Sequence, residues 1–435
     1  MTDGGSGRQA VSPPDGPEPR PAPAPSLPGR PSPPAALYVH VPFCRSLCPY
    51  CDFVVYAGRD ATGPRARVVA FVEAAVREVH LRADAADASH GLPRTTVRPP
   101  LATLYVGGGT PSMLPAAALA EIVAAVRDRF GLEPGAEVTL EANPGPDERG
   151  DLAGFARAGV TRISVGAQAL DDAELRSLGR RHRAGDVADA VAAAREAGIE
   201  RVSLDLLYDL PRQRLATWAA TLEAALTLAP DHVSCYALTL DDPDEEGLTG
   251  PAGDHLPTTP GARRWRERAR NGQDEDRAAA AYALADAAFE GSGMPWYELS
   301  NWAVPGAESR HNLAYWERRP YEAVGPGAHA FDGVTRRWNA ARLDGWLDAL
   351  LPAGGGPAAL PPGGFEDLDP AAAAAEELFL GLRMARGIPR AAAVDRLDAF
   401  AWAAEAGLVE DAPDDRVRLT MRGRLLSNEL FARLI

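Results

Sequence analysis

The sequence lacks an apolar run long enough to cross a membrane, and its N-terminal segment lacks the apolar core of a signal peptide. We therefore expect no stable membrane insertion, which leaves open transient docking to a membrane-bound partner. Positive charge is also scarce, because 45 Lys and Arg residues against 60 Asp and Glu residues leave a formal net charge of −15. An acidic chain is repelled by phosphate backbones and anionic lipids, so nucleic acid is not an expected partner.

Cysteine is the next scarce residue. The 435 residues contain four, and three of them, Cys44, Cys48 and Cys51, stand together in HVPFCRSLCPYCDF. The spacing disfavours disulfides, and clustered free thiols are typical of a reducing compartment, which predicts a cytoplasmic protein. A CxxxCxxC loop offers three thiolates, whereas a [4Fe-4S] cluster normally takes four, so one iron would keep a place for an exchangeable ligand. Radical S-adenosylmethionine (SAM) proteins use this spacing, and SAM takes that place.

Structural zinc is the alternative at this loop, but it takes four protein ligands. The remaining cysteine, Cys235, is distant in the sequence and lies in a β-like run. His40 could complete a zinc set, yet it alternates with Tyr38 on an apparent strand. The sequence therefore favours an iron–sulfur cluster.

From Ala35 onward, short β-rich runs alternate with Ala-rich helical stretches, which is the pattern of βα units around a parallel sheet. We predict strands over 36–42, 102–108, 137–143, 162–168, 201–208 and 232–240, and helices over 65–88, 115–130, 148–158, 186–197 and 214–228. Six units are too few to close an eight-stranded barrel. The predicted fold class is therefore α/β, with a partial (β/α)6 radical SAM barrel over residues 36–240.

The segments that flank this barrel differ in composition. Residues 1–35 are rich in Pro, Gly and Ala, which predicts a disordered tail, with a polyproline ligand for an SH3-like partner as the alternative. Residues 241–350 form an extension that begins with an acidic loop and later becomes dense in aromatic residues. A Gly/Pro-rich linker over 351–365 then precedes a mainly helical, winged-helix-like domain over 366–435. Acidic residues in that domain argue against DNA binding.

Polar residues stand where the predicted strands end, at the rim that carries the working groups of βα barrels. GGGTPS (107–112) follows the second strand and lacks the ending of a Walker loop, so its backbone either grips SAM or forms a simple turn. Glu141, Gln168 and Asp205 stand in or near the ends of later strands, and Arg180 follows one of them. These side chains could bind the amino acid head group and the ribose of SAM. Alternatively, Glu141 or Asp205 could cap a following helix, Gln168 could hydrogen-bond within a loop, and Arg180 could form a solvent-exposed ion pair.

A second candidate site is HNLAYW (311–316), which places His311 one helical turn from Tyr315, with Trp316 beside it. A neutral imidazole can be an axial ligand of heme, and nearby aromatic rings can cover the macrocycle. The alternative is a histidine that is hydrogen-bonded inside an aromatic core.

The cysteine loop, GGGTPS, LEANP, RISVGAQ, LGRRH, DLLYDLP, YELSNWA, HNLAYW and GPGAH together resemble the oxygen-independent coproporphyrinogen III oxidase-like family of radical SAM proteins. The resemblance covers residues 36–330 and extends through the C-terminal domain. It implies a [4Fe-4S] cluster on Cys44, Cys48 and Cys51, with SAM as a cofactor. The positions that match SAM contacts are Tyr38, Gly108, Gly109, Thr110, Glu141, Gln168, Arg180 and Asp205.

One residue beside the cluster separates two groups of this family. The dehydrogenase pattern continues CxxxCxxCxC, whereas this chain has Phe53 in place of the fourth cysteine, and HNLAYW is the type of motif associated with heme binding in the heme chaperone group. The resemblance therefore implies a chaperone that binds heme, with His311 as candidate ligand, and delivers it to an acceptor protein.

Two enzymatic functions remain as alternatives. A coproporphyrinogen III dehydrogenase would convert propionates to vinyls by radical decarboxylation, which Phe53 disfavours, and a radical SAM methyl transferase would act on a small molecule. Two departures from the family pattern bear on which substrate or partner the protein binds, and they do not bear on the cluster. Asp209 stands where the family tends to have Gly, and the acidic loop after Leu240 is longer than usual.

Overall fold

The computed structural model describes residues 32–435 except 59–60, 62–66 and 90–97, so most of the predicted tail over 1–35 lies outside the described residues. The described chain contacts the sheet region before Ala36. The amide of Ser32 donates to the carbonyl of Asp332 at 2.8 Å, and the amide of Ala35 donates to that of Pro320 at 2.8 Å. No helix in the described ranges is both long and apolar enough to cross a membrane.

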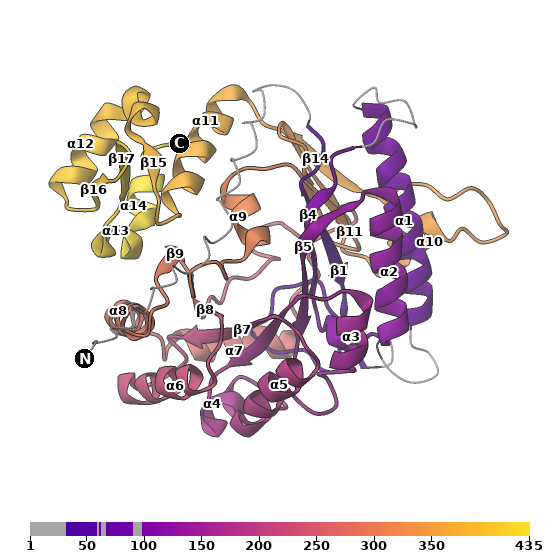
Figure 1. The fold of residues 1–435 in the computed structure, drawn as a ribbon, viewed down its shortest axis with the longest axis horizontal. Coiled ribbons are helices and arrows are strands. Elements are labelled where there is room, and N and C mark those ends of the chain that lie inside the picture. The colour runs from indigo at the N-terminus through magenta and orange to yellow at the C-terminus, as the bar shows by residue number, and fades with distance from the viewer. Residues whose placement is uncertain (1–31, 59–60, 62–66, 90–97) are drawn as a thin grey trace, which may run out of the picture.

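A strongly curved, open sheet forms the centre of the molecule (Figure 1). Six of its strands run side by side in chain order, each parallel to the next, and confirm the six predicted strands and the partial barrel. They are β1 (Ala36–Val41), β4 (Leu101–Gly108), β5 (Leu132–Ala142), β6 (Arg162–Gln168), β7 (Arg201–Tyr208) and β8 (His232–Ala237). The helices that follow the first five are α1 (Val68–Ser89), α2 (Ala116–Arg129), α3 (Leu152–Ala158), α5 (Ala184–Glu196) and α6 (Leu215–Thr227).

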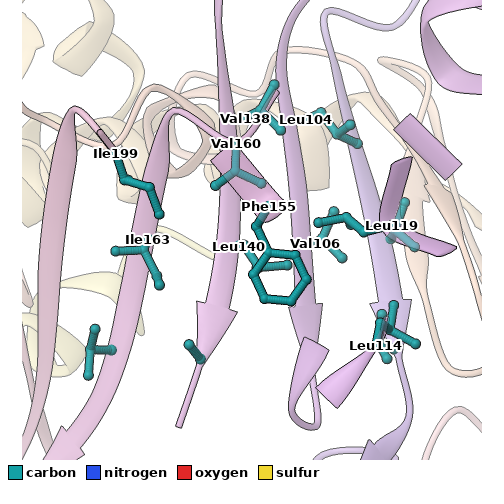
Figure 2. Packing of buried hydrophobic residues seen from close by; sticks show 14 of the residues in the cluster. Leu104, Val106, Leu114, Leu119, Val138, Leu140, Phe155, Val160, Ile163 and Ile199 are labelled. Atoms are coloured by element: carbon teal, nitrogen blue, oxygen red, sulfur yellow. The ribbon is translucent and has the colours of Figure 1, made fainter. Parts of the chain in front are cut away.

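The main core lies between this sheet and its helices. Leu104 and Val106 of β4 and Leu140 of β5 are fully buried, and they gather with Leu119 of α2 and Phe155 of α3 (Figure 2). Because successive side chains of a strand point to opposite faces, the residues between these apolar positions face the inside of the partial barrel. That inner face carries the polar residues of the candidate site.

Additional strands widen the sheet on both sides. Beyond β1 lie β11 (Tyr321–Val324), β12 (His329–Phe331), β13 (Thr335–Asn339) and β14 (Gly363–Asp367), and beyond β8 lie β10 (Asn301–Ala303) and β9 (Trp296–Glu298). β14 occupies the end of the segment 351–365 that we predicted to be a linker. It is mostly exposed and held by its pairing with β13, so it has no apolar alternation from which a strand could be predicted.

The C-terminal part is mainly helical, as predicted, and has its own apolar core. It comprises α11 (Pro370–Leu382), α12 (Leu397–Glu405), α13 (Met421–Leu425) and α14 (Ser427–Phe431) around a small sheet of β15 (Ile388–Pro389), β17 (Arg416–Leu419) and β16 (Val409–Ala412). The guanidinium of Arg424 donates to both oxygens of Asp286 in α8 (Glu275–Gly291), at 2.7 and 2.9 Å. This buried ion pair ties the C-terminal part to the barrel.

Candidate functional site

The carboxyl ends of the parallel strands surround a cavity of about 770 Å³, a size typical of small-molecule sites. The structure brings most of the predicted cluster and SAM residues to its wall. These are Cys44, Cys48, Cys51, Gly108, Gly109, Glu141, Gln168, Arg180 and Asp205. Phe53, which has an exposed fraction of 60%, also lies on this wall.

The cysteine loop packs directly against the glycine loop that follows β4. Cys44 ends the short strand β2 (Phe43–Cys44), and its Sγ lies 3.1 Å from Oγ1 of the buried Thr110. A Cβ atom on Gly109 would lie 2.6 Å from the carbonyl oxygen of Phe43, so a side chain has no room there. Glycine at this position therefore allows the two backbones to approach each other.

Two carboxylates face the cavity, one from β5 and one from β7, and β6 lies between these strands. Glu141 accepts hydrogen bonds from the hydroxyl of Tyr105 at 2.8 Å and from the amide of Gly108 at 2.9 Å. Asp205 accepts from the hydroxyl of Ser164 at 3.0 Å. Burial and then the charge of Asp205 raise the pKa of Glu141 to about 7, and burial likewise raises the pKa of Asp205. A cationic ligand in the cavity would stabilise both carboxylates in their charged form.

Arg180 connects the cysteine loop to the strand ends. Its guanidinium donates to Oδ1 of Asn143, to the carbonyl of Gly166 at 2.9 Å, and to Sγ of Cys48 at 3.6 Å. Gln168 ends β6 with a φ of 64°, which turns the chain sharply at the cavity wall. Arg180 is thus a fixed positive charge beside Cys48, a predicted iron ligand.

The donor set fits a cluster held by three cysteines. Burial raises the pKa of Cys44 to about 12 and also raises that of Cys51, so both thiols carry protons that iron binding would release. In the part of the chain that the structure describes, no three His, Cys, Asp or Glu side chains are already close enough to hold a metal ion. Cys235 is fully buried in β8 and unpaired, consistent with a role in packing.

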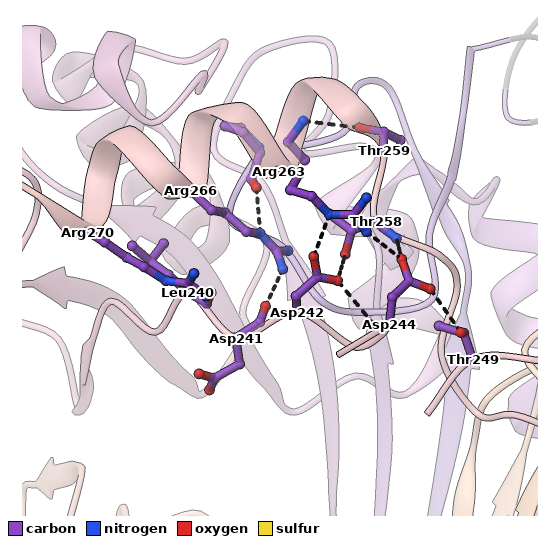
Figure 3. Close-up of polar contacts among 12 residues, drawn as sticks. Leu240, Asp241, Asp242, Asp244, Thr249, Thr258, Thr259, Arg263, Arg266 and Arg270 are labelled. Atoms are coloured by element: carbon purple, nitrogen blue, oxygen red, sulfur yellow. Dashed lines mark hydrogen bonds and ion pairs between the residues drawn. The ribbon is translucent and has the colours of Figure 1, made fainter. Parts of the chain in front are cut away.

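The acidic loop after Leu240 carries a network that sequence reasoning missed (Figure 3). The helix α7 (Pro260–Arg270) follows this loop, and its Arg263 donates to Asp242 and to Asp244, at 2.8 Å each. Hydrogen bonding from Arg263 lowers the pKa of Asp242 to about 2. The loop carboxylates are therefore engaged by arginine and by threonine hydroxyls, so the loop is an ordered part of the fold.

Arg266 of the same helix reaches the cysteine loop. Its side chain is buried and donates to the carbonyls of Pro49 at 3.1 Å, Cys51 at 2.9 Å, and Asp241. An arginine in a charged helix gives no sequence signal for this contact, because its partners are backbone carbonyls far away in the chain. We identify Arg266 as a residue that positions the loop.

Tyr38 and Thr110 are the two predicted SAM residues that do not form part of the cavity wall. The hydroxyl of Tyr38 lies 3.0 Å from Nδ1 of His40, and its ring centroid is 6.1 Å from that of Tyr105. Nε2 of His40 in turn lies 2.9 Å from the carbonyl of Val54, just after the cysteine loop. Thr110 contacts the sulfur of Cys44, as described above. Both residues therefore lie one layer behind the surface that a ligand would touch.

HNLAYW forms the short helix α9 (Arg310–Trp316), which lies near the amino-terminal part of β4. His311 is buried; its Nδ1 lies 2.7 Å from the hydroxyl of Thr103, and its Nε2 lies 2.8 Å from the hydroxyl of Tyr315. Burial lowers the pKa of His311 to about 3. Trp316 lies under the guanidinium of Arg383 at 4.3 Å. His311 as a heme ligand remains a prediction, and it would require one of these two hydrogen bonds to break.

Comparison with known proteins identifies the family of this chain. The model of the radical SAM superfamily matches residues 38–225. Heme chaperone HemW of Mycobacterium tuberculosis is 38% identical over 419 residues, covering 95% of this chain and 98% of the relative, and HemW of Bacillus subtilis is 30% identical over 407 residues, covering 91% and 97%.

The bovine mitochondrial protein named radical S-adenosyl methionine domain-containing protein 1 is 36% identical over 330 residues, covering 74% of this chain and 68% of that protein. Among solved structures, coproporphyrinogen III oxidase (HemN) from Escherichia coli superposes with a TM-score of 0.73 at 21% identity, covering 93% of this chain and 90% of HemN, and so shares the fold. This chain belongs to the HemW heme chaperone family of the radical SAM superfamily.

Proposed function

We propose that this protein binds heme and delivers it to an acceptor protein, with a [4Fe-4S] cluster and SAM bound in the cavity at the ends of the barrel strands. The observation that carries the proposal is the match over nearly the whole chain to proteins named heme chaperone HemW. Phe53 adds support, because it stands where the dehydrogenase pattern has its fourth cysteine.

The residues of the cavity suggest how the two cofactors are held. Cys44, Cys48 and Cys51 would ligate three irons, and SAM would complete the fourth. Glu141 and Asp205 would face the positive charges of SAM, and the backbone of the glycine loop would receive its amino acid part. Cluster and SAM together supply one-electron chemistry when bound, while the chain binds and orients them.

The free, clustered cysteines lead us to place the protein in the cytoplasm. We infer that it meets its acceptor there by transient docking, including docking to an acceptor that is itself bound to a membrane. The negative net charge of −15 makes a nucleic acid partner unsuitable.

An anaerobic experiment tests the proposed function. The cluster is reconstituted, heme is titrated while absorbance is recorded, and the same protein is assayed with SAM, a reductant and coproporphyrinogen. The proposal expects saturable binding of one heme per chain and no decarboxylated product. Product formation without tight heme binding would instead identify a coproporphyrinogen III dehydrogenase.

A further inference from the structure

Asp254 joins two imidazole rings on the surface near the cysteine loop. Its Oδ1 lies 3.0 Å from Nδ1 of His255, and its Oδ2 lies 2.8 Å from Nε2 of His329. The carboxylate is 13% exposed, whereas the two histidine side chains are 27% and 45% exposed. Within the described ranges, no hydrogen bond engages Nε2 of His255 or Nδ1 of His329, so each ring keeps one nitrogen for a ligand.

The backbone around these rings is held firmly against the sheet. Nε1 of Trp338 donates to the carbonyl of Ala252 at 3.0 Å, and the amide of Ala341 donates to that of Gly253 at 2.8 Å. A Cβ atom on Gly327, which has a φ of 73°, would lie 3.0 Å from the carbonyl oxygen of Asp254. The acidic loop and the turn before β12 therefore pack backbone against backbone and fix where the imidazoles stand.

An aromatic ring packs on His329, and the cysteine loop lies beside the same turn. The ring of Trp338 stacks on His329 at 5.9 Å between centroids and 24° between planes. The same Cβ atom on Gly327 would lie 2.5 Å from Cγ2 of Val54, so the end of the cysteine loop packs against the turn that also contacts Asp254. Phe53 directly precedes Val54 and is one of the most exposed large apolar residues among those described.

This arrangement suits an iron that arrives with its own macrocycle. Histidines that bind metals typically donate their second ring N–H to a carboxylate, which fixes the tautomer and strengthens the ligand. A bare metal ion such as zinc typically takes three or four protein ligands. Heme iron, in contrast, already has the four porphyrin nitrogens and needs only axial ligands.

We propose that Nε2 of His255 is an axial ligand of the heme iron, that Asp254 and His329 position this imidazole, and that Phe53 and Trp338 contact the porphyrin. The inference rests on the proposed function, since it assigns the iron ligand of the same heme. His255 differs from His311 in the feature that matters, because both ring nitrogens of His311 already have hydrogen-bonding partners. The assignment also gives a role to the acidic loop, which contains Asp254 and His255.

The test uses the full-length protein with its cluster reconstituted, and it compares heme titrations of the wild type, His255→Gly, Asp254→Asn and His311→Ala. The absorption and electron paramagnetic resonance spectra report the axial ligand directly. We expect His255→Gly to lose the wild-type spectrum and at least about tenfold in affinity, and Asp254→Asn to lose roughly tenfold. His311→Ala should keep the wild-type spectrum.

Added imidazole separates loss of a ligand from loss of structure. Imidazole should restore the wild-type spectrum of heme in His255→Gly, which a misfolded variant would not allow. The assignment would be overturned if His255→Gly kept the wild-type spectrum and affinity. It would also be overturned if His311→Ala lost them while His255→Gly did not. If the wild type binds no heme, the proposed function itself fails, and this inference falls with it.

Discussion

The guanidinium of Arg266 donates to the carbonyl oxygen of Cys51 at 2.9 Å, which joins residues 215 positions apart in the sequence. The same side chain donates to Pro49 and Asp241, so one buried cation holds both the cysteine loop and the start of the acidic loop. The network of Asp242, Asp244 and Arg263 fixes the N-terminal end of the same helix (Figure 3). The segment beyond the six-stranded core thus supports the predicted cluster site.

Arg266→Ala should weaken cluster retention. The substitution leaves the carbonyls of Pro49, Cys51 and Asp241 without their buried donor, and each unsatisfied group costs about 1–3 kcal/mol. We expect a lower midpoint of chemical unfolding and faster loss of the cluster absorbance in air. Arg264→Ala on the exposed side of the same helix is the matched control and should resemble the wild type. Equal cluster lifetimes in both variants would contradict the role of Arg266.

The three single variants Cys44→Ala, Cys48→Ala and Cys51→Ala should each take up much less iron and sulfide than the wild type on anaerobic reconstitution. Each of these thiols lines the cavity, and a cluster with only two protein ligands is poorly held. Cys235→Ala is the control, because this buried thiol lies in the core of β8. Iron content close to wild type in any of the three variants would argue against a three-cysteine cluster.

Gly109→Ala should disturb the contact between the glycine loop and the cysteine loop. The added methyl group would lie 2.6 Å from the backbone oxygen of Phe43, which cannot rotate away as a flexible side chain can. We expect a loss of about 1–3 kcal/mol in the free energy of unfolding and weaker SAM binding measured by calorimetry. Gly185→Ala provides the comparison, because a methyl group in that first turn of α5 meets no atom within 4 Å.

SAM affinity should increase as the pH rises from 6 to 8. Glu141 has a pKa of about 7 in the free protein, raised by burial and by Asp205, so it is mostly protonated at pH 6 and mostly charged at pH 8. A cationic ligand prefers the charged carboxylate, so at pH 6 Glu141 must lose its proton before SAM binds. The affinity for SAM should therefore be roughly tenfold higher at pH 8 than at pH 6. Glu141→Gln cannot ionise and should show a flat profile. A flat profile in the wild type would remove Glu141 from SAM recognition.

The six-stranded core and its cavity could be predicted from sequence because each strand carries a local signal. Strands such as Arg162–Gln168 and Arg201–Tyr208 have the predicted bounds, and their polar ends meet because parallel strands share one rim. The strand Gly363–Asp367 could not be predicted, since only pairing with its neighbour forms it. Arg266 was missed for a similar reason, because its partners are backbone carbonyls distant in the chain.

Asp209 shows how structure explains a departure that sequence could only note. Its φ is 56°, a conformation that glycine adopts without strain and that would suit the Gly expected there from the family resemblance. In this chain its carboxylate pairs with Arg277 of α8 and accepts from the amide of Asp274. These contacts hold Asp209 in its left-handed conformation directly after β7.

Heme binding is the property on which the proposed function depends. The most direct measurement is an anaerobic heme titration of the cluster-reconstituted full-length protein, with a parallel assay for coproporphyrinogen turnover in the presence of SAM and reductant. We expect saturable binding of one heme per chain with no protoporphyrinogen formed. Formation of protoporphyrinogen by a protein that does not bind heme tightly would contradict it and would make this chain an enzyme of porphyrin synthesis.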